Sequence, residues 1–396
     1  MDKYLLIENV SVVYPDKTEE GKSVLVKNGC IYDTDFTGEI PQNTSVYNGN
    51  GGYLLAGFVD LHVHGGGGAD FMDLSVDAYQ TVAKTHAHHG TTMLLPTAMA
   101  ATYEDLVKFI SVFKEYKKTP HSGARLHALH LEGPYFSGAT GKSVGAQNSS
   151  LLRYPDEKEI DALLKVADGD IIRWDAAPEL PGFDMFARKM RENGIIASVA
   201  HSAATSEQAL AAFEQGFSHV THFYNAVTTY HKPAQKVLAG VVEAAYLTEN
   251  VSVELIGDGC HIPRDVLRLA LKIKGPHRVS MITDAMRIAG TDLTHGKLGS
   301  NKTGTDVIVD DGVAKLKDLS SFAGSIATMD RVIRVLCQDY GVSINTASVM
   351  MSLTPARLIG VDNRFGSIAV GKTADLVLMD THLQIKQVFI GGEKIN

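Results

Sequence analysis

Two histidines at the end of an apolar segment are the first residues that indicate chemistry. The segment reads Leu54-Leu-Ala-Gly-Phe-Val-Asp-Leu-His-Val-His64, and four glycines follow it. An apolar run that a Gly-rich turn ends is typical of a buried strand. Because alternate residues of a strand share one face, the rings of His62 and His64 should point the same way. Imidazole binds divalent metals, so the pair indicates a metal site; taken alone, it also fits solvated or packing histidines.

Further histidines and carboxylates stand at or just after the ends of other apolar segments. They are Glu132 in Leu129–Pro134, His201 after Ile195–Val199, His222 after His219–Thr221, Asp258 and His261 after Val251–Ile256, and Asp284 after Val279–Thr283. Each alone could be an ion-pair partner, a helix cap or a packing residue. Together, four imidazoles and a carboxylate can hold one or two divalent ions and leave positions open for water. The remaining histidines, among them His86 and His130, are interpreted as surface or packing residues.

The elements that must position these residues alternate, from Leu54 onward, between short apolar strands and longer helical segments. Because parallel strands need crossover helices, this alternation predicts a parallel sheet. Eight strands are expected near Tyr53–His62, Thr91–Pro96, Arg125–Leu131, Ile171–Ala176, Ile195–Val199, His219–Thr221, Val251–Ile256 and Val279–Thr283. Helices are expected at Ser75–His89, Tyr103–Lys117, Pro155–Ala167, Phe183–Asn193, Thr205–Gln215 and Pro263–Lys274. Eight such units predict an α/β fold of the (β/α)8 TIM-barrel type, with its active site at the carboxyl ends of the strands. A doubly wound sheet is the alternative, but no G-x-G-x-x-G sequence follows a strand.

Both ends of the chain are rich in short strands, whereas the middle is α/β. Tyr4–Val10, Ser23–Gly29, Cys30–Tyr32, Ala374–Met379 and Ile385–Ile390 are the expected strands, and helices are expected at Thr328–Tyr340 and Ile344–Met351. We therefore expect one small β-sandwich domain built from both termini, residues 1–53 and 359–396. The barrel, residues 54–358, would be inserted in it.

Composition restricts the class of protein. The chain has 396 residues with 44% apolar and 21% charged side chains, and its net charge of -8 argues against a nucleic-acid partner. Its three cysteines lie far apart without a C-x-x-C pair, which favours a reducing, cytoplasmic location. The first residues carry Asp2, Lys3 and Glu8 and do not resemble a signal peptide, and no apolar run reaches the length of a membrane span. We expect a soluble protein with no membrane partner.

Longer sequence strings resemble a known family. They are Leu129-His-Leu-Glu-Gly-Pro134, His201-Ser-Ala-Ala-Thr205, Thr221-His-Phe-Tyr-Asn-Ala226, Asp258-Gly-Cys-His261, Thr283-Asp-Ala285, Phe322-Ala-Gly-Ser325 and Gly366-Ser-Ile-Ala-Val-Gly-Lys-Thr-Ala-Asp-Leu-Val377. The set is similar to that of the N-acetylglucosamine-6-phosphate deacetylases of the amidohydrolase superfamily. The resemblance extends over essentially the whole chain.

The resemblance implies a metal-dependent hydrolase of a linear amide in amino-sugar catabolism. Glu132, His201 and His222 would hold the primary metal ion, His62 and His64 would allow a second ion, and Asp284 would be the catalytic acid and base. Substrate contacts would come from Ala146, Gln147, Asn225, Ala226, Asp258, Gly259, Cys260, His261, Phe322, Ala323, Gly324 and Ser325. It also implies a homodimer. Zn is the first choice of metal, with Fe, Co or Mn as alternatives that suit the same ligands.

Asp284 has a defined task in this chemistry. A divalent ion makes water acidic enough to attack the acetyl carbonyl near neutral pH and stabilises the oxyanion. Asp284 is expected to accept the proton and to deliver it to the departing sugar amine. A hydrogen-bond donor from the loop after the third strand is expected to help the metal ion stabilise the oxyanion.

Two positions depart from the family pattern. Many relatives have histidine in place of Gln147, whose amide can still donate a hydrogen bond to a carbonyl oxygen. Relatives also carry an arginine for the sugar phosphate shortly after the Asn-Ala pair, but Val227–Lys236 contains none. Lys232 or His231 could bind phosphate as point charges without the bidentate fork of arginine, or both could be plain loop residues.

Other functions remain open at this stage. The substrate could be N-acetylglucosamine 6-phosphate, N-acetylgalactosamine 6-phosphate or an unphosphorylated N-acetyl hexosamine. A hydrolase of cyclic amides or N-acyl amino acids would usually carry lysine in place of Glu132. A barrel that only binds sugar would need neither Asp284 nor the metal ligands.

Overall fold

A parallel sheet forms the middle of the chain in the computed structural model, which describes residues 2–138, 141–232 and 235–395. Its strands follow one another in the order β6, β9, β11, β12, β13, β14, β15, β16, and the short β10 also pairs with β9. Their bounds are β6 Phe58–Val63, β9 Thr91–Ala98, β10 Arg125–Leu126, β11 Leu129–Tyr135, β12 Ile171–Ala176, β13 Ile196–Val199, β14 Phe217–Val220, β15 Ser252–Ile256 and β16 Val279–Ile282. The predicted α/β class with parallel strands is confirmed.

The first and last strands of this sheet also meet. Val63, at the end of β6, forms a parallel bridge with Ala285, just after β16. The backbone nitrogen of Asp284 donates to the carbonyl of His62 at 3.0 Å, and that of His64 donates to the carbonyl of Ala285 at 2.9 Å. This contact brings the polar residues that follow β6 and β16 side by side.

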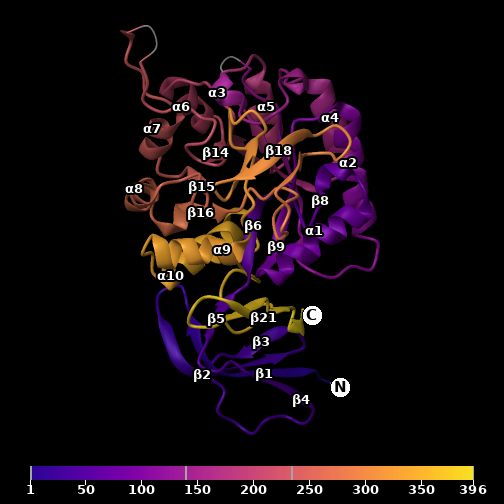
Figure 1. The fold of residues 1–396 in the computed structure, drawn as a ribbon, viewed down its shortest axis with the longest axis vertical. Coiled ribbons are helices and arrows are strands. Elements are labelled where there is room, and N and C mark those ends of the chain that lie inside the picture. Colours follow the sequence, from indigo (N-terminus) through magenta and orange to yellow (C-terminus); the bar gives the residue numbers. More distant parts are fainter. Residues whose placement is uncertain (1, 139–140, 233–234, 396) are drawn as a thin grey trace.

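Helices connect most of the parallel strands and surround them (Figure 1). Several begin at side-chain caps, for example Thr205 at the start of α6. Its hydroxyl accepts a hydrogen bond from the backbone of Gln208, and the side chain of Gln208 accepts one from the backbone of Thr205. Their bounds are α1 Val76–His88, α2 Tyr103–Tyr116, α3 Gly141–Val144, α4 Glu157–Ala167, α5 Phe183–Glu192, α6 Ser206–Glu214, α7 Val241–Leu247 and α8 Arg264–Lys274. The six predicted helices are confirmed with small shifts of their ends, whereas the short α3 and α7 were not predicted.

A second sheet combines strands from both termini, and the two chain ends lie near each other beneath the parallel sheet (Figure 1). It runs in the order β22, β21, β20, β5, β1, β2, β3, with β4 paired to β1. Its strands are β1 Tyr4–Val13, β2 Thr18–Lys27, β3 Cys30–Asp33, β4 Thr44–Asn48, β5 Tyr53–Ala56, β20 Leu376–Met379, β21 Ile385–Ile390 and β22 Glu393–Lys394.

Two predicted strands are each two strands in the structure. The predicted Tyr53–His62 is divided at Gly57: β5 belongs to the terminal sheet and β6 to the parallel sheet. A Cβ at Gly57 would lie 2.1 Å from Thr92 Oγ1, so the chain can cross between the sheets only with glycine there. The predicted Arg125–Leu131 is divided into β10 and β11, and β11 continues to Tyr135.

The chain after β16 contains elements that the sequence reading missed. A three-stranded antiparallel sheet consists of β17 His295–Leu298, β18 Thr305–Asp310 and β19 Val313–Leu316, and β18 crosses the middle of the view in Figure 1. The predicted helices there are mixed: α9 Met329–Arg334 continues as a π-helical turn, and α10 Ile344–Ser348 continues through another into α11 Thr354–Leu358. No helix among the described residues is long and apolar enough to cross a membrane.

Candidate active site

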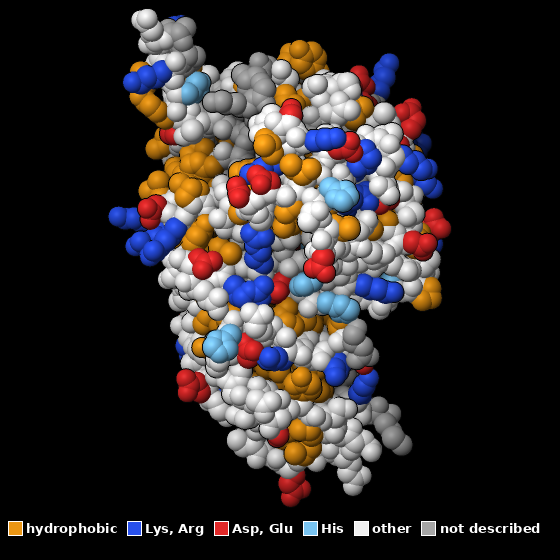
Figure 2. All heavy atoms as spheres, viewed as in Figure 1, with side chains coloured by type: hydrophobic (Ala, Val, Ile, Leu, Met, Phe, Trp, Pro, Cys, Tyr) orange, Lys and Arg blue, Asp and Glu red, His pale blue; other side chains and the backbone are white. Residues whose placement is uncertain are grey.

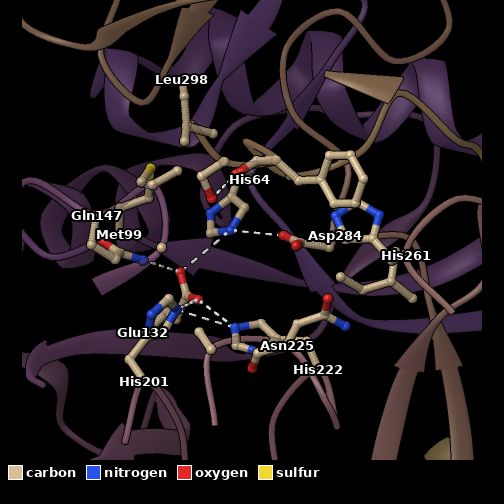
Figure 3. A pocket seen from close by; sticks show the side chains of 17 residues that line it. His64, Met99, Glu132, Gln147, His201, His222, Asn225, His261, Asp284 and Leu298 are labelled. Carbon is tan, nitrogen blue, oxygen red and sulfur yellow. Dashed lines mark hydrogen bonds and ion pairs between the residues drawn. The ribbon is translucent and has the colours of Figure 1, made fainter. Parts of the chain in front are cut away.

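Six polar side chains from five parallel strands or the turns after them converge in one place, and Figure 3 shows all of them except His62. Two groups can each offer three ligand atoms to an ion, and all six residues are buried. The first group is Glu132, His201 and His222, and the second is His62, His64 and Asp284. The structure thus brings together every residue that was predicted as a metal ligand or as the catalytic acid.

The first group is built around one carboxylate oxygen. Oε1 of Glu132 lies 3.0 Å from Nε2 of His201 and 3.2 Å from Nε2 of His222, and the two nitrogens are 3.2 Å apart. Ligand atoms about 2.0–2.2 Å from a tetrahedral ion are separated by about 3.2–3.6 Å. The spacing of these three atoms therefore fits a divalent ion at their centre.

The second group lies directly beside the first. Nε2 of His62 and Nε2 of His64 are 3.2 Å apart, and Oδ1 of Asp284 is 3.5 Å and 3.2 Å from them. Glu132 links the groups, because its Oε2 lies 3.5 Å from Nε2 of His64. A carboxylate between two imidazole groups can bridge two ions.

The other ring nitrogen of each histidine is bonded to an acceptor. Nδ1 of His64, His201 and His222 lies 3.2, 2.8 and 3.0 Å from the carbonyl oxygens of Thr97, Ser143 and Asn225, and Nδ1 of His62 lies 3.0 Å from Oε1 of Glu254. A carbonyl can only accept, so Nδ1 carries the proton and the neutral ring presents a lone pair at Nε2. Four such lone pairs point toward one another and toward two carboxylates. Because these groups repel each other unless positive charge lies between them, the arrangement fits metal binding.

Without a metal, protons can supply part of that positive charge. Burial opposes the charged form of His64, but the hydrogen bond and charge of Asp284 and the charge of Glu132 raise its pKa to about 9. Burial likewise opposes charge on His222, yet Glu132 raises its pKa to about 9. Burial works against ionisation of Asp284 too, but the neighbouring His62 and His64 hold its pKa below the usual value. The site therefore has a strong preference for bound positive charge.

Three residues of the site have a left-handed backbone. The φ angles of His201, His222 and Asp284 are 44°, 28° and 49°. Each follows the last residue of a strand by two positions, where the chain turns out of the sheet. Such conformations cost about 1–3 kcal/mol each in residues other than glycine and cluster at functional sites. This strain is an indication of function that does not depend on the residue types.

A buried ionic network supports the site from within the sheet and was missed by the sequence reading. Arg173 donates to both oxygens of Glu254, at 2.5 and 2.8 Å, and to Oδ1 of Asp175 at 3.2 Å. These three residues are fully buried. His130 lies in the same network, with Nε2 2.9 Å from Oδ2 of Asp175, so it is a buried polar partner of Asp175 and not the surface or packing residue that was predicted. Glu254 fixes Nδ1 of His62 and thereby orients that ring.

A cavity of about 140 Å³ opens onto the two groups, and seven of the predicted substrate residues line it: Ala146, Gln147, Asn225, Ala226, His261, Phe322 and Gly324. The ring of Phe322 lies 4.7 Å from that of His261, centroid to centroid. A Cβ at Gly324, where φ is +67°, would lie 2.9 Å from the carbonyl oxygen of Asp284. This glycine allows its loop to pack against the turn that carries Asp284.

Five other predicted substrate residues do not line this cavity. Asp258 is buried and accepts from Nδ1 of His261 at 2.8 Å, which orients that ring. Ser325 donates its backbone N–H to the Asp284 carbonyl at 2.8 Å. Gly259, Cys260 and Ala323 are not among the residues that line the cavity. Asp258 and Ser325 thus support residues of the site through hydrogen bonds, whereas Gly259 is exposed and has no direct access to the cavity.

Gln147 contacts the ligand set itself. Its amide nitrogen donates to Oε2 of Glu132 at 2.7 Å, and its amide oxygen accepts from the backbone of Ala100 at 3.0 Å. The side chain is therefore held at both ends and oriented toward the carboxylate. The sequence reading placed Gln147 at the substrate carbonyl and did not anticipate its bond to Glu132.

Lys232 lies away from the cavity. Its side chain is exposed, and its ammonium group lies 5.9 Å from the ring centroid of Tyr230. His231, the other predicted phosphate contact, has Nδ1 2.8 Å from the carbonyl oxygen of Thr229. Neither residue lines the cavity within this chain.

Comparison with known proteins decides the family. Residues 53–395 match the model of the amidohydrolase family. The chain belongs to this family. It is 30% identical over 389 residues to an N-acetylglucosamine-6-phosphate deacetylase of Lysinibacillus sphaericus, with 98% of this chain and 97% of that protein covered. It is also 31% identical to an N-acetylgalactosamine-6-phosphate deacetylase of Escherichia coli O157:H7, with 89% and 90% covered.

Solved structures give the same result for this amidohydrolase. The N-acetylglucosamine-6-phosphate deacetylase of Pasteurella multocida superposes with a TM-score of 0.90 at 29% identity, over 99% of both chains. A variant of the Mycobacterium smegmatis enzyme, in complex with N-acetyl-D-glucosamine-6-phosphate, gives 0.88 at 28% identity and covers 100% of this chain and 99% of its own. The resemblance stated from the sequence is thereby confirmed.

Proposed function

We propose that this amidohydrolase hydrolyses the acetamide of N-acetyl-D-glucosamine 6-phosphate to glucosamine 6-phosphate and acetate, a step of amino-sugar catabolism. The observation that carries the proposal is the position of the Glu132 carboxylate between two pairs of histidines, His201 with His222 and His62 with His64. Asp284 lines the same cavity as Glu132. Relatives named for this reaction, at about 30% identity over nearly the whole chain, support it. N-acetylgalactosamine 6-phosphate is the second candidate, because a relative named for it is equally similar.

The metal centre of the proposal has two positions. Glu132, His201 and His222 would hold the primary ion, and His62, His64 and Asp284 would hold the second. Zn is the first choice, and Fe, Co or Mn suit the same nitrogen and oxygen ligands. The support is the spacing of the six ligand atoms and the four histidines whose Nδ1 atoms face acceptors.

The residues of the chain divide the work of amide hydrolysis. A bound divalent ion supplies an acidic water and stabilises negative charge on the carbonyl oxygen. Asp284, with its pKa below the usual value, is ionised near neutral pH and can accept the proton of that water. It then hands the proton to the amine nitrogen as the C–N bond breaks. Gln147 keeps the Glu132 carboxylate in place.

The sugar would occupy the side of the cavity that Asn225, Ala226, His261 and Phe322 line. The amide of Asn225 and the ring of His261 can hydrogen-bond hydroxyl groups. Asp258, Gly259, Cys260, Ala323 and Ser325 would support these contacts from outside the cavity. Lys232 would reach the phosphate only from a second copy of the chain or after a movement of its loop. If it does neither and no other group of the site binds the phosphate, the substrate is an unphosphorylated N-acetyl hexosamine.

A homodimer would supply such a second copy. Exposed hydrophobic side chains lie on the loop before α7 and at its end, namely Tyr230, Val237 and Leu247, and Figure 2 shows hydrophobic side chains gathered on the flank where Figure 1 labels α6 and α7. Such a surface is typical of subunit contacts. We also propose a cytoplasmic location, which the free cysteines Cys30, Cys260 and Cys337 support.

The proposal includes the finer architecture. Residues 54–358 would hold a closed (β/α)8 barrel that begins at β6, because β5 extends the terminal sheet to Ala56. The Val63–Ala285 bridge between its first and last strands is the support. Residues 1–53 and 359–396 would form a small β-sandwich domain, supported by the sheet that combines strands of both termini.

Amine release from four substrates in parallel tests the proposal. The purified protein, supplied with Zn, is given N-acetylglucosamine and N-acetylgalactosamine, each with and without the 6-phosphate. Preferred turnover of the phosphorylated glucosamine derivative is the expected result. Faster turnover of the free sugars would contradict the phosphate part, and no amine from any substrate would contradict the function.

A further inference from the structure

A second, larger cavity adjoins the one that holds the metal ligands. It measures about 740 Å³, and Met99, Ala146 and Leu298 line both cavities. These three residues therefore separate the reaction site from the second cavity, which we name the adjoining cavity. The separating side chains are apolar, and Met99 is unbranched and flexible, so it can yield to a ligand.

The two ends of the reaction site differ in chemistry. Asn225 and His261 lie on one side of Glu132 and Asp284, whereas Met99 and Leu298 lie on the other (Figure 3). The first side can hydrogen-bond sugar hydroxyls, whereas Met99 and Leu298 cannot. Gln147 lies beside Met99 (Figure 3), but its amide is already bonded to Glu132 and to the backbone of Ala100. An N-acylated sugar whose amide carbon lies between Glu132 and Asp284 would thus place its acyl chain toward Met99 and Leu298. The adjoining cavity continues in that direction.

Fixed segments of chain form the wall of the adjoining cavity. Arg287, 4% exposed, donates to Asp73 Oδ1 at 2.9 Å, to the carbonyl of Gly299 at 2.8 Å and to that of Gly68 at 2.9 Å. The backbone of Asn301 donates to the same Asp73 oxygen at 2.8 Å. These bonds join the segment after β8 to the segment after β17, and both segments line the cavity. They also give the Asp73 carboxylate the guanidinium of Arg287 as its ion-pair partner. The space is therefore a built feature and not a gap between loose loops.

We infer that the site accepts N-acyl groups longer than acetyl, with the extra carbons passing Met99, Ala146 and Leu298 into the adjoining cavity. The reaction is the same hydrolysis: water adds to the acyl carbon, the C–N bond breaks, and a proton goes to the amine nitrogen, giving a carboxylate and an amino sugar. The inference rests on the proposed function, because it extends the substrate class of the same site.

Turnover of an acyl series tests the inference. The metal-replete protein is given N-acetyl, N-propionyl and N-butyryl derivatives of the amino sugar that it deacetylates fastest, and kcat/KM is measured from amine release. We expect the N-butyryl value within about tenfold of the N-acetyl value. A closed pocket would lose about 10–200-fold for a methylene that does not fit. Turnover of N-acetyl with a loss of more than about tenfold for N-butyryl would overturn the inference alone, and no turnover of any derivative would overturn the proposed function with it.

A substitution in the adjoining cavity locates the acyl chain. Leu151 lines that cavity but not the reaction site, so Leu151→Trp should reduce the N-butyryl to N-acetyl ratio of kcat/KM at least tenfold. Thr303→Trp, at an exposed position of the same cavity, should act in the same direction if the first variant fails to fold. Leu293→Trp, at a position 48% exposed, is the matched control and should leave the ratio unchanged. An unchanged ratio in both cavity variants would contradict this path for the acyl chain.

Discussion

Glu254→Gln is the substitution that most specifically tests the network beneath the site. Glu254 is fully buried and is held by both terminal nitrogens of Arg173, at 2.5 and 2.8 Å. Its Oε1 also faces Nδ1 of His62 at 3.0 Å. Glutamine has nearly the same volume, but it carries no charge and replaces one acceptor oxygen with an NH2 donor. That donor must then face Arg173 or His62, each of which donates itself.

The expected magnitude follows from burial. Removal of one partner from a buried ion pair costs about 3–5 kcal/mol, because the remaining charge is left without compensation. Arg173 keeps Asp175, 3.2 Å from its Nε, so we expect about 3 kcal/mol, a large part of the roughly 5–15 kcal/mol that stabilises a folded domain. His62 also loses the charged carboxylate that fixes its ring, because glutamine offers it either a neutral oxygen or an NH2 group. This should weaken ion binding by His62, His64 and Asp284 about 10–100-fold.

Two measurements on purified protein check this prediction. Urea denaturation of the metal-free protein should show the lower free energy of unfolding, and metal analysis after dialysis should show loss of the second ion while the primary ion stays bound. Glu249→Gln, at an exposed position before the same strand, is the matched control. A Glu254→Gln protein with parental stability and parental metal content would refute the supporting role of the network.

Three further predictions concern the ligands and the acid. Asp284→Asn should lower kcat by at least about 10²–10⁴, while analysis should still find the ion bound to Glu132; retained activity would exclude Asp284 as the acid and base. Gln147→Ala removes the donor to Oε2 of Glu132 and should weaken metal affinity about 10–100-fold in a chelator competition; an unchanged affinity would show that the bond does not matter. In the metal-free protein the pKa values of His64 and His222 are raised to about 9, so their stabilising protonation is complete below about pH 6.5 and is lost as the pH rises through 9. Metal must displace these protons, so apparent metal affinity should rise with pH over that window; a pH-independent affinity would contradict these shifts.

The metal ligands could be predicted because their signal is local. His62 and His64 share a strand face, and His201, His222 and Asp284 each stand just after a strand. Glu132 was expected at a strand end, but β11 continues past it to Tyr135. Neighbouring parallel strands end on the same side of a sheet. These residues could therefore be expected to lie close together in space, although they are far apart in the sequence. The resemblance to relatives added their probable roles, which the convergence of the six side chains supports.

Other features depend on contacts that no local pattern shows. Arg173, Asp175 and Glu254 lie inside strands of the sheet, and in the sequence each is an isolated charge that would suit a surface position equally well. They are stable inside only because neighbouring strands bring them together in compensating pairs. The pairing of Gln147 with Glu132 likewise depends on the course of the loop between them.

The boundaries of two strands were wrong for a related reason. Residues 53–63 form an apolar run without clear alternation, because strands buried on both faces read as continuous. Only the close contact of Gly57 with Thr92 shows where the chain leaves one sheet for the other. The strands β17 to β19 were missed because each is short and only partly buried, so their residues lack a long apolar run.

Acetate release from N-acetylglucosamine 6-phosphate, before and after removal of metal, tests the central claim most directly. The protein is stripped with a chelator, dialysed and then titrated with Zn at a fixed protein concentration. We predict negligible acetate from the stripped protein and recovery of turnover that saturates at one or two ions per chain. Full activity of a protein shown by analysis to be free of metal would contradict the claim.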